Sequence, residues 1–368
     1  MGGATSSMMT SREAEAMSKQ LKLTDREWRA FFIKDLFTIS TGSIVPREQL
    51  APGLMPRITA TEQNNGVDSF TAPLEEKSFR TNADCLSISF LGAVFYQSNA
   101  SSFDMKIHSL NLKNKTLGKH VGLFVATELR KQFAKFSYGN QLSSSTLLRQ
   151  KFQLPSIDGS PDWNFMSAYM RQEEKVLMKE AISRLERQLA ENHAEPVAFK
   201  GREWRAFFIE DLATIDSGIR LKKADMKAGE TPFVGASEME NGVTGFVSNK
   251  NESRDKDVLG VNYNGSVCYS FYHPYEALFS DDVKRIKLKD RNAHSKYTLL
   301  FLSVAIAGQK EKYAYGYKFN SRRMKRQLLM LPVTPDGTPD WAFMSAYMQQ
   351  LEQKMLREAL AYFKGKIR

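Results

Sequence analysis

An eight-residue segment of the sequence occurs twice, and this internal repeat limits the possible folds more than any other feature. It begins at Arg26 and returns unchanged at Arg202, reading Arg-Glu-Trp-Arg-Ala-Phe-Phe-Ile in both places. A second segment that opens with Pro-Asp-Trp begins at Pro161 and again at Pro339, so it recurs at almost the same interval. Two matches in the same order indicate a tandem duplication, which predicts two copies of one domain.

Composition supports two globular copies and a polyanionic partner. Of the 368 residues, 42% are hydrophobic and 25% charged, so each copy is able to bury a core. The net charge of +11 favours a polyanion, with nucleic acid first and a membrane surface second, although a basic protein without such a partner is the alternative. Cys85 and Cys268 lie in apolar, strand-like runs, which predicts buried, reduced thiols.

Several classes of protein are not indicated by the sequence. No apolar run is long enough to span a membrane, and residues 1–19 lack the apolar centre of a secretory signal, so we expect a cytoplasmic protein. Cysteine and histidine spacings fit no zinc site, and we predict no metal. Because glycine-rich phosphate loops and a nucleophile elbow are also absent from the sequence, a binding module is favoured over an enzyme.

A long helix is predicted after each Pro-Asp-Trp. Aspartate is a good helix N-cap, and apolar residues then recur at steps of three or four positions on both copies. One helix cannot bury such a stripe alone, so the two helices are expected to pack on each other; the alternative is that each packs on its own domain. The predicted divisions are an N-terminal tail that is frayed or forms a short helix (1–20), a first domain (21–160), a first long helix (161–195), a second domain (196–338) and a second long helix (339–368).

The two copies agree in framework and differ in loops. Between Glu311 and Arg326 six basic residues interleave with aromatic ones, whereas the matching segment from Asn140 to Arg149 is mostly neutral and polar. Arginine and lysine contact phosphates or guanine edges, while asparagine and glutamine can pair with adenine. Two related domains that read different DNA targets are expected to differ in this way. The alternative for the basic segment is that it is a solvated helix start.

These features resemble the DNA-specificity (S) subunits of type I restriction–modification systems and the related specificity subunits of type IIB-like systems. The resemblance covers about Leu21 to Phe363 and rests first on the opening Phe-Phe-Ile-x-Asp-Leu-x-x-Ile-x-x-Gly at Phe31 and Phe207. It also rests on Gly-Ser-Val followed by Ser-Asp-Asp-Val in copy two, on a polar loop before each Leu-Pro, and on each long helix. Copy one departs from this pattern because Ser102-Phe103-Asp104-Met105 matches the Ser-Asp-Asp-Val only in part.

The resemblance implies an α+β chain with two tandem target recognition domains. Each domain would read one half of a split DNA site, and the long helices would form an antiparallel coiled-coil spacer with pseudo-two-fold symmetry. The spacer would set the distance between the halves and dock DNA adenine methyltransferase subunits, with a restriction subunit or a fused nuclease domain as a further partner. The chain itself would be a non-catalytic subunit without a cofactor, while the methyltransferase partner would use S-adenosylmethionine.

Candidate residues follow from position alone, because target bases do not carry over from the family. The candidates for binding double-stranded DNA are Lys106, Lys113, Lys115, Tyr138, Asn140, Gln141, Ser143, Ser144, Ser145, Arg149, Asn264, Ser266, Tyr272, His273, Tyr317, Lys318, Asn320, Arg322, Arg323 and Lys325. The candidates for the helix pair and the partner interface are Met166, Met170, Leu177, Leu185, Met344, Met348, Leu351 and Met355. Two alternatives stay open: a self-contained DNA-modifying or DNA-cutting enzyme with a cryptic active site, and an interaction scaffold whose charge is incidental.

Overall fold

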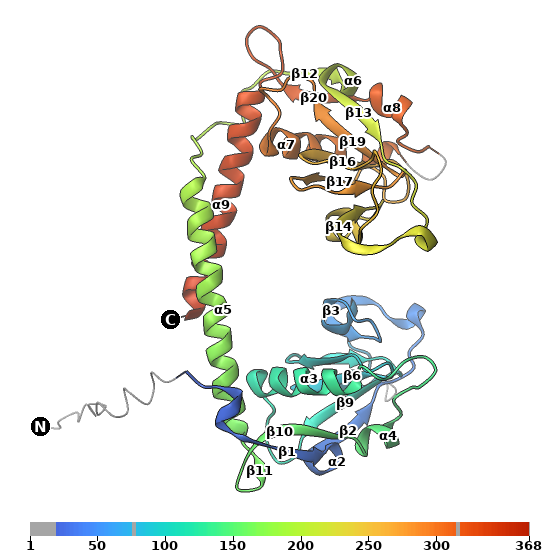
Figure 1. Ribbon diagram of the computed structural model, residues 1–368, viewed down its shortest axis with the longest axis vertical. Coiled ribbons are helices and arrows are strands. Elements are labelled where there is room, and N and C mark those ends of the chain that lie inside the picture. The colour runs from blue at the N-terminus through green and yellow to red at the C-terminus, as the bar shows by residue number, and fades with distance from the viewer. Residues whose placement is uncertain (1–19, 76–78, 314–316, 368) are drawn as a thin grey trace, which may run out of the picture. The chain divides into compact units, whose positions relative to one another are not determined.

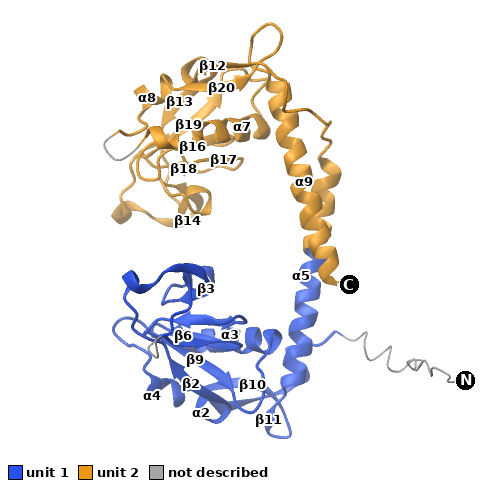
Figure 2. Cartoon of the chain, turned by 180° about the vertical axis from the view of Figure 1, so that it is seen from behind, with its two compact units in different colours: residues 1–180 blue, residues 181–368 orange. Residues whose placement is uncertain are grey.

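The computed structural model describes residues 20–75, 79–313 and 317–367 and divides into two compact units, with the boundary between Glu180 and Ala181 (Figures 1 and 2). The predicted N-terminal tail lies outside the described residues apart from Gln20. Helices and strands follow one another in nearly the same order in both copies, and each copy ends in a long helix. The mixed helix and strand content that the repeat predicted is therefore confirmed.

The first copy builds its domain from strands and short helices before the long helix α5. Its helices and strands are β1 (Glu27–Phe32), α2 (Ile33–Leu36), β2 (Phe37–Thr41), β3 (Pro52–Ile58), β4 (Val67–Thr71), β5 (Thr81–Asn82), β6 (Cys85–Ser89), β7 (Val94–Gln97), β8 (Ser101–Phe103), β9 (Ile107–Leu112), α3 (Lys119–Phe133), α4 (Ser144–Leu148), β10 (Lys151–Ile157), β11 (Ser160–Pro161) and α5 (Trp163–Glu191). The antiparallel sheet β2-β9-β6-β7 forms the centre, β4-β3-β8-β5 forms a smaller sheet, and β1-β10-β11 forms a third.

The second copy repeats this arrangement. Its helices and strands are β12 (Trp204–Phe208), α6 (Ile209–Leu212), β13 (Ala213–Ser217), β14 (Ala228–Val234), β15 (Val243–Val247), β16 (Val258–Asn262), β17 (Ser270–His273), β18 (Leu278–Phe279), β19 (Val283–Leu288), α7 (Lys296–Ala307), α8 (Ser321–Lys325), β20 (Leu328–Pro332) and α9 (Trp341–Ile367). Its sheets are β13-β19-β16-β17, β15-β14-β18 and β12-β20. The repeated Arg-Glu-Trp-Arg segment thus supplies the edge strand β1 or β12, which pairs with the strand leading to the long helix.

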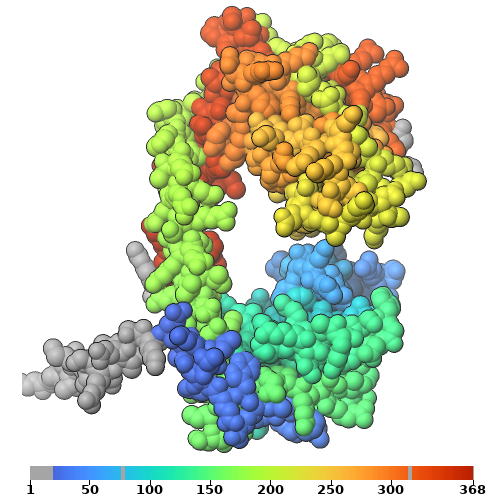
Figure 3. All heavy atoms as spheres, viewed as in Figure 1, coloured from blue at the N-terminus to red at the C-terminus, as the bar shows by residue number. Residues whose placement is uncertain are grey.

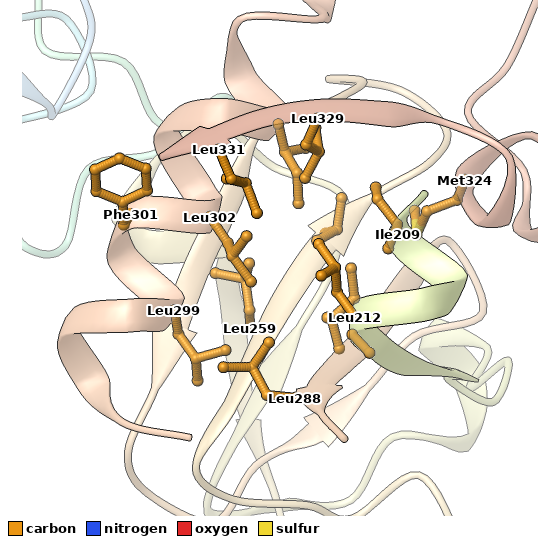
Figure 4. Packing of buried hydrophobic residues seen from close by; sticks show 14 of the residues in the cluster. Ile209, Leu212, Leu259, Leu288, Leu299, Phe301, Leu302, Met324, Leu329 and Leu331 are labelled. Carbon is orange, nitrogen blue, oxygen red and sulfur yellow. The ribbon is translucent and has the colours of Figure 1, made fainter. Parts of the chain in front are cut away.

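A separate core lies under the central sheet of each copy. In unit 2 the helix α7 places Leu299 and Leu302 against Leu259 and Leu288 of the sheet, as Figure 4 shows. In unit 1 buried residues of α3 belong to one hydrophobic cluster with residues of β6 and β9. Both cysteines are free and buried, as predicted. Cys85 begins β6, whereas Cys268 lies in the turn between β16 and β17 and not in a strand.

The two repeated sequence segments meet at the start of each long helix. The Asp162 Oδ1 atom accepts the Phe165 N–H at 2.9 Å and so caps α5, while its Oδ2 atom accepts the Arg26 Nε–H at 2.8 Å. The same pairing joins Arg202 to Asp340 at 2.7 Å in unit 2. Burial alone would raise the pKa of the Asp162 carboxyl, but the bonds from Arg26 and the helix N–H groups lower it overall.

Beyond their first turns the long helices are largely exposed, as the surface of α5 in Figure 3 illustrates. Within unit 2 the end of α5 contacts α9: the Asn192 amide donates to the Gln349 carbonyl at 3.2 Å and to Glu352 at 3.1 Å. Glu186 pairs with Lys364 at 2.7 Å. As the chain advances along α5, its partners on α9 lie progressively earlier, so these segments of unit 2 run in opposite directions.

Candidate nucleic-acid interface

In unit 1 most loop candidates gather on one short segment. The Ser143 hydroxyl caps helix α4 by accepting the Thr146 N–H at 3.2 Å. Leu142 and Leu147 are buried and fix this segment to the core. Their burial leaves the polar side chains of the same loop, namely Asn140, Gln141, Ser143, Ser145 and Arg149, exposed to solvent, with Ser144 half-buried.

Two other candidates flank this loop. The Leu142 N–H donates to the Phe90 carbonyl at 2.8 Å, which places Phe90 beside the loop. Tyr138 is 75% exposed, and its ring meets the Phe90 ring edge to face with centroids 5.8 Å apart. The Lys106 ammonium lies 4.7 Å from the centroid of the Phe90 ring. Ser144 lies 3.4 Å from His108, a histidine whose pKa is lowered by burial. Unit 1 therefore presents mostly neutral hydrogen-bonding groups, with the two cations Arg149 and Lys106 and one exposed aromatic ring.

The matching segment of unit 2 is strongly cationic. The Asn320 side chain caps α8 by accepting the Arg323 N–H at 3.0 Å, and Phe319 and Met324 are buried as anchors. A hollow of about 370 Å³ lies over this segment. It is lined by Lys312, Tyr313, Tyr317, Asn320, Arg322, Arg323 and Arg326, which include four cations and no carboxylate.

An aromatic stack forms one wall of this hollow. The rings of Tyr313 and Tyr317 are stacked with centroids 5.7 Å apart, and the Arg323 guanidinium lies 3.8 Å from the Tyr317 ring centroid. Burial raises the pKa of Tyr313 to about 12, so its hydroxyl stays protonated and donates to Gln327 at 2.6 Å. Cations and flat rings together suit the phosphates and bases of DNA.

Two further candidates of unit 1, Lys113 and Lys115, follow strand β9. Lys106 precedes β9 and Lys113 follows it, and a six-residue strand spans about 20 Å. The Lys113 ammonium donates to the Lys34 carbonyl at 2.7 Å. Lys115 lies 4.8 Å from the Trp163 ring centroid at the start of α5. Lys113 is therefore engaged at α2, whose Ile33 N–H donates to the Gln150 carbonyl at the end of the polar loop, and Lys115 is engaged at the start of the long helix α5.

The remaining candidates of unit 2 lie around the β16–β17 hairpin. Asn264 donates to Asp282 at 2.9 Å, and the Tyr272 hydroxyl donates to Asp257 at 2.7 Å; Ser266 is half-buried in the turn. His273 is fully buried, with neither ring nitrogen hydrogen-bonded within the described residues. Its selection as a DNA contact is therefore wrong, because a side chain with no accessible surface cannot touch a ligand.

The helix candidates fall into two groups. Met166 and Met344 are fully buried in the cores of their own units, and Met170 and Met348 pack against the same cores. The selection of Met166 and Met344 for the helix pair or partner interface is wrong, because these two side chains are fully enclosed by their own domains. Met170 and Met348 are half-buried, and their selection stays a prediction. The others lie further along the helices: Leu177, Leu351 and Met355 are exposed and Leu185 is half-buried.

Four residues that hold these loops were missed as candidates. The Lys135 ammonium donates to the Gln150 side chain at 3.0 Å, and the Lys312 ammonium donates to Gln327 at 3.1 Å. The signal was present, because an Arg-Gln pair closes the loop in both copies and a lysine stands fifteen residues before each glutamine. Among the residues described, no cluster of three or more potential metal ligands occurs, and no helix is long and apolar enough to cross a membrane.

Comparison with known proteins agrees with this arrangement. The type I restriction modification DNA specificity domain matches the chain twice, at residues 25–187 and 201–361. The specificity subunit S.BcgI of a type II restriction enzyme from Heyndrickxia coagulans is 36% identical over 332 residues, covering 90% of this chain and 96% of that protein. The chain belongs to the family of restriction–modification DNA specificity subunits and carries two tandem target recognition domains.

Solved structures of similar proteins were also found. A type I restriction–modification S subunit from M. genitalium is 16% identical, with a TM-score of 0.48 and coverage of 95% of this chain and 94% of that one. An HsdS subunit from Thermoanaerobacter tengcongensis is 13% identical, with a TM-score of 0.32 and coverage of 92% and 94%.

Proposed function

We propose that each target recognition domain reads one part of a bipartite DNA site and that the chain acts as a non-catalytic subunit. One observation carries the proposal: equivalent loops on equivalent frames expose different chemistry, neutral and polar in unit 1 but cationic in unit 2. Two readers with different side chains recognise two different half-sites.

The loop chemistry indicates how each half reads DNA. In unit 1, Asn140 and Gln141 carry amides that pair with adenine edges, and the serine hydroxyls bond to either bases or phosphates. In unit 2, Arg322, Lys325 and Arg326 suit phosphates or guanine edges. Tyr317 and Arg323 supply flat surfaces against which sugar or base can pack.

The long helices are proposed as an antiparallel spacer. Support comes from unit 2, where Glu186 contacts Lys364 and the later Asn192 contacts the earlier Gln349, so the two helical segments run in opposite directions. The helix α5 has 29 residues and is about 43 Å long at ~1.5 Å per residue. At roughly 3.4 Å per base pair this length sets an upper limit of about 13 base pairs for the unread spacer.

The proposed partners are DNA adenine methyltransferase subunits, with a restriction subunit or fused nuclease domain completing the complex. Exposed apolar side chains on the helices, namely Leu177, Leu351 and Met355, support a protein partner there. The chain would need no cofactor of its own, the partner would use S-adenosylmethionine, and the complex would work in the cytoplasm.

Selection from a randomised duplex library, with the methyltransferase subunit present, tests this function. We expect two short fixed sequence blocks at a constant separation. A single continuous block, or no enrichment, would contradict the two-reader proposal. A parallel assay of the chain alone with DNA, magnesium and S-adenosylmethionine should give no turnover; methylation or cleavage by this chain would support a self-contained enzyme instead.

A further inference from the structure

The reading loops of the two units are held at both ends by the same contacts. We define the unit-1 loop as residues 135–150 and the unit-2 loop as the described residues from 312 to 327. In each, the first residue is a lysine that donates to the last residue, a glutamine, at 3.0 Å in unit 1 and 3.1 Å in unit 2. The backbone carbonyls of these glutamines accept from Ile33 and Ile209, at 3.0 Å in both units. The two loops therefore have equal length and equal anchorage.

The interiors of the loops also share one frame. Backbone N–H groups of Leu147 and Met324 donate to Ser143 and Asn320 at 2.8 Å in both units. Those two polar residues cap the short helices α4 and α8 through their side chains. The buried residues fall at the same positions, Leu142 and Leu147 in unit 1 and Phe319 and Met324 in unit 2. The same turn is thus built twice, with different sequences.

Five positions on this frame have the same degree of exposure or nearly so, but differ in chemistry. All ten side chains are exposed or half-buried. Written with the unit-1 residue first, the pairs are Asn140 and Tyr317, Gln141 and Lys318, Ser145 and Arg322, Thr146 and Arg323, and Leu148 and Lys325. By contrast, the solvent-exposed arginine before the closing glutamine, Arg149 or Arg326, is retained in both copies.

We infer that these five positions choose the half-site and that their side chains are interchangeable between the two units. This inference rests on the proposed function. A shared frame places side chains from equivalent Cα positions in equivalent directions, so their donors and acceptors face the DNA in the same way. The retained arginine suits a contact that both halves have in common, the phosphate backbone, whereas base readout requires groups that differ.

The lysine and glutamine at the loop ends act as positioning residues. The Gln327 side chain is buried, and its carbonyl oxygen accepts from Lys312 and Tyr313. Its amide group donates to Gln309 at 3.0 Å and to the Leu328 carbonyl at 2.6 Å. Gln150 likewise donates to the Thr146 carbonyl at 3.2 Å, inside its own loop. These bonds hold the loop closed without using the side chain of any of the five exposed positions.

The transfer is tested with a fivefold variant of the whole chain. Tyr317→Asn, Lys318→Gln, Arg322→Ser, Arg323→Thr and Lys325→Leu give unit 2 the exposed side chains of unit 1. Selection from the randomised duplex library, with the methyltransferase subunit present, should then return the wild-type unit-1 block in both positions at the wild-type separation. Retention of the wild-type second block, or its loss with no gain of the unit-1 block, would overturn the inference.

The reciprocal variant guards against misfolding. It combines Asn140→Tyr, Gln141→Lys, Ser145→Arg, Thr146→Arg and Leu148→Lys, and it should return the unit-2 block twice. Thermal unfolding of each variant identifies one that has lost its fold, and the other then decides the outcome. If the wild-type chain selects one continuous block, the proposed function fails; if it selects two blocks that the variants leave unchanged, only the present inference fails.

The positioning role has its own readout. Gln150→Leu should relax base preference in the unit-1 block alone, while the unit-2 block and its separation stay as in the wild type. Gln150→Glu keeps an acceptor for Lys135 but loses the donor to the Thr146 carbonyl, so it should restore the preference in part. A loss of both blocks together, or a Leu variant with wild-type preference, would contradict a local positioning role.

Discussion

The cationic loop of unit 2 gives a quantitative prediction for the dependence of DNA affinity on salt. Arg322 and Lys325 are exposed, and within the described residues neither forms a hydrogen bond or an ion pair. Arg323 differs, because it packs on Tyr317 and donates to the Lys318 carbonyl at 2.8 Å. Replacing Arg322 and Lys325 with alanine therefore removes two free cations while leaving the internal stack in place.

If both cations lie in the groove beside the phosphates, they neutralise nearby phosphate charge while they face the bases, and the double variant loses two counterion-releasing contacts. The slope of log K against log salt should then become shallower by about 1.8, at ~0.9 per phosphate. Between 50 and 200 mM salt, wild-type affinity should fall about twelvefold more than that of the variant, by the same relation. Fluorescence anisotropy with a labelled duplex that carries the selected site, measured with the complete complex, gives both slopes.

A matched control separates contact from general charge. Lys250→Ala combined with Arg291→Ala removes two exposed cations of unit 2 that lie outside the loop and form no hydrogen bond or ion pair with any described residue. This control should keep the wild-type slope. Equal changes of slope in both double variants would refute the reasoning, because the effect would then come from net charge and not from the loop.

Three further predictions concern stability and use chemical unfolding of the chain as their measurement. Met344→Ala should lower the free energy of unfolding by about 2–5 kcal/mol because this side chain is fully buried. Met355→Ala, at an exposed position, should change it by less than about 0.5 kcal/mol. Equal effects of the two substitutions would contradict the packing described. Burial lowers the pKa of His273 to about 4, so the unfolded chain binds the proton more readily and stability should fall as pH drops from about 6.5 towards 4, by at most about 3 kcal/mol. His273→Gln should flatten that slope, and an unchanged pH profile would refute the assignment. Asn192→Ala should lower the free energy of unfolding by about 1–3 kcal/mol because the buried Asn192 amide bonds to α9. Lys364→Ala breaks an exposed ion pair with Glu186 and should lower it by less than about 1 kcal/mol. A larger effect of Lys364→Ala would argue against the contact of Asn192 with α9.

The duplication made much of the fold predictable from the sequence. Two copies, a mixed domain and a long helix after Asp162 and Asp340 all follow from repeated segments and periodicity, and the structure contains them. The periodicity could not say which neighbour an apolar side chain meets, because a stripe at helical spacing serves a partner helix or the helix's own domain equally well. Met166 and Met344 were therefore assigned to the wrong surface.

The candidate site was predictable only in part, for a related reason. The loops at Asn140 and Arg322 were identified because they are polar and because they differ between two copies whose flanking segments agree. His273 stands in a polar-looking Tyr-His-Pro run, and only the paired strands β16 and β17 show that its ring points into the interior. The contact of Lys135 with Gln150 depends on a turn of the chain that local sequence does not specify.

The Arg26–Asp162 pair explains why such loops can vary without disturbing the rest of each unit. It ties the first strand of the domain to the cap of its long helix, and the Arg26 guanidinium also lies 4.8 Å from the Phe165 ring centroid on the helix's first turn. The equivalent Arg202 in unit 2 makes the same two contacts, with Asp340 and Phe343. Each helix therefore leaves its domain in a direction set by framework residues, which the loops do not touch. Under the proposed function, a change in the bases read requires new side chains on the loop but no change in the helix that sets the spacing.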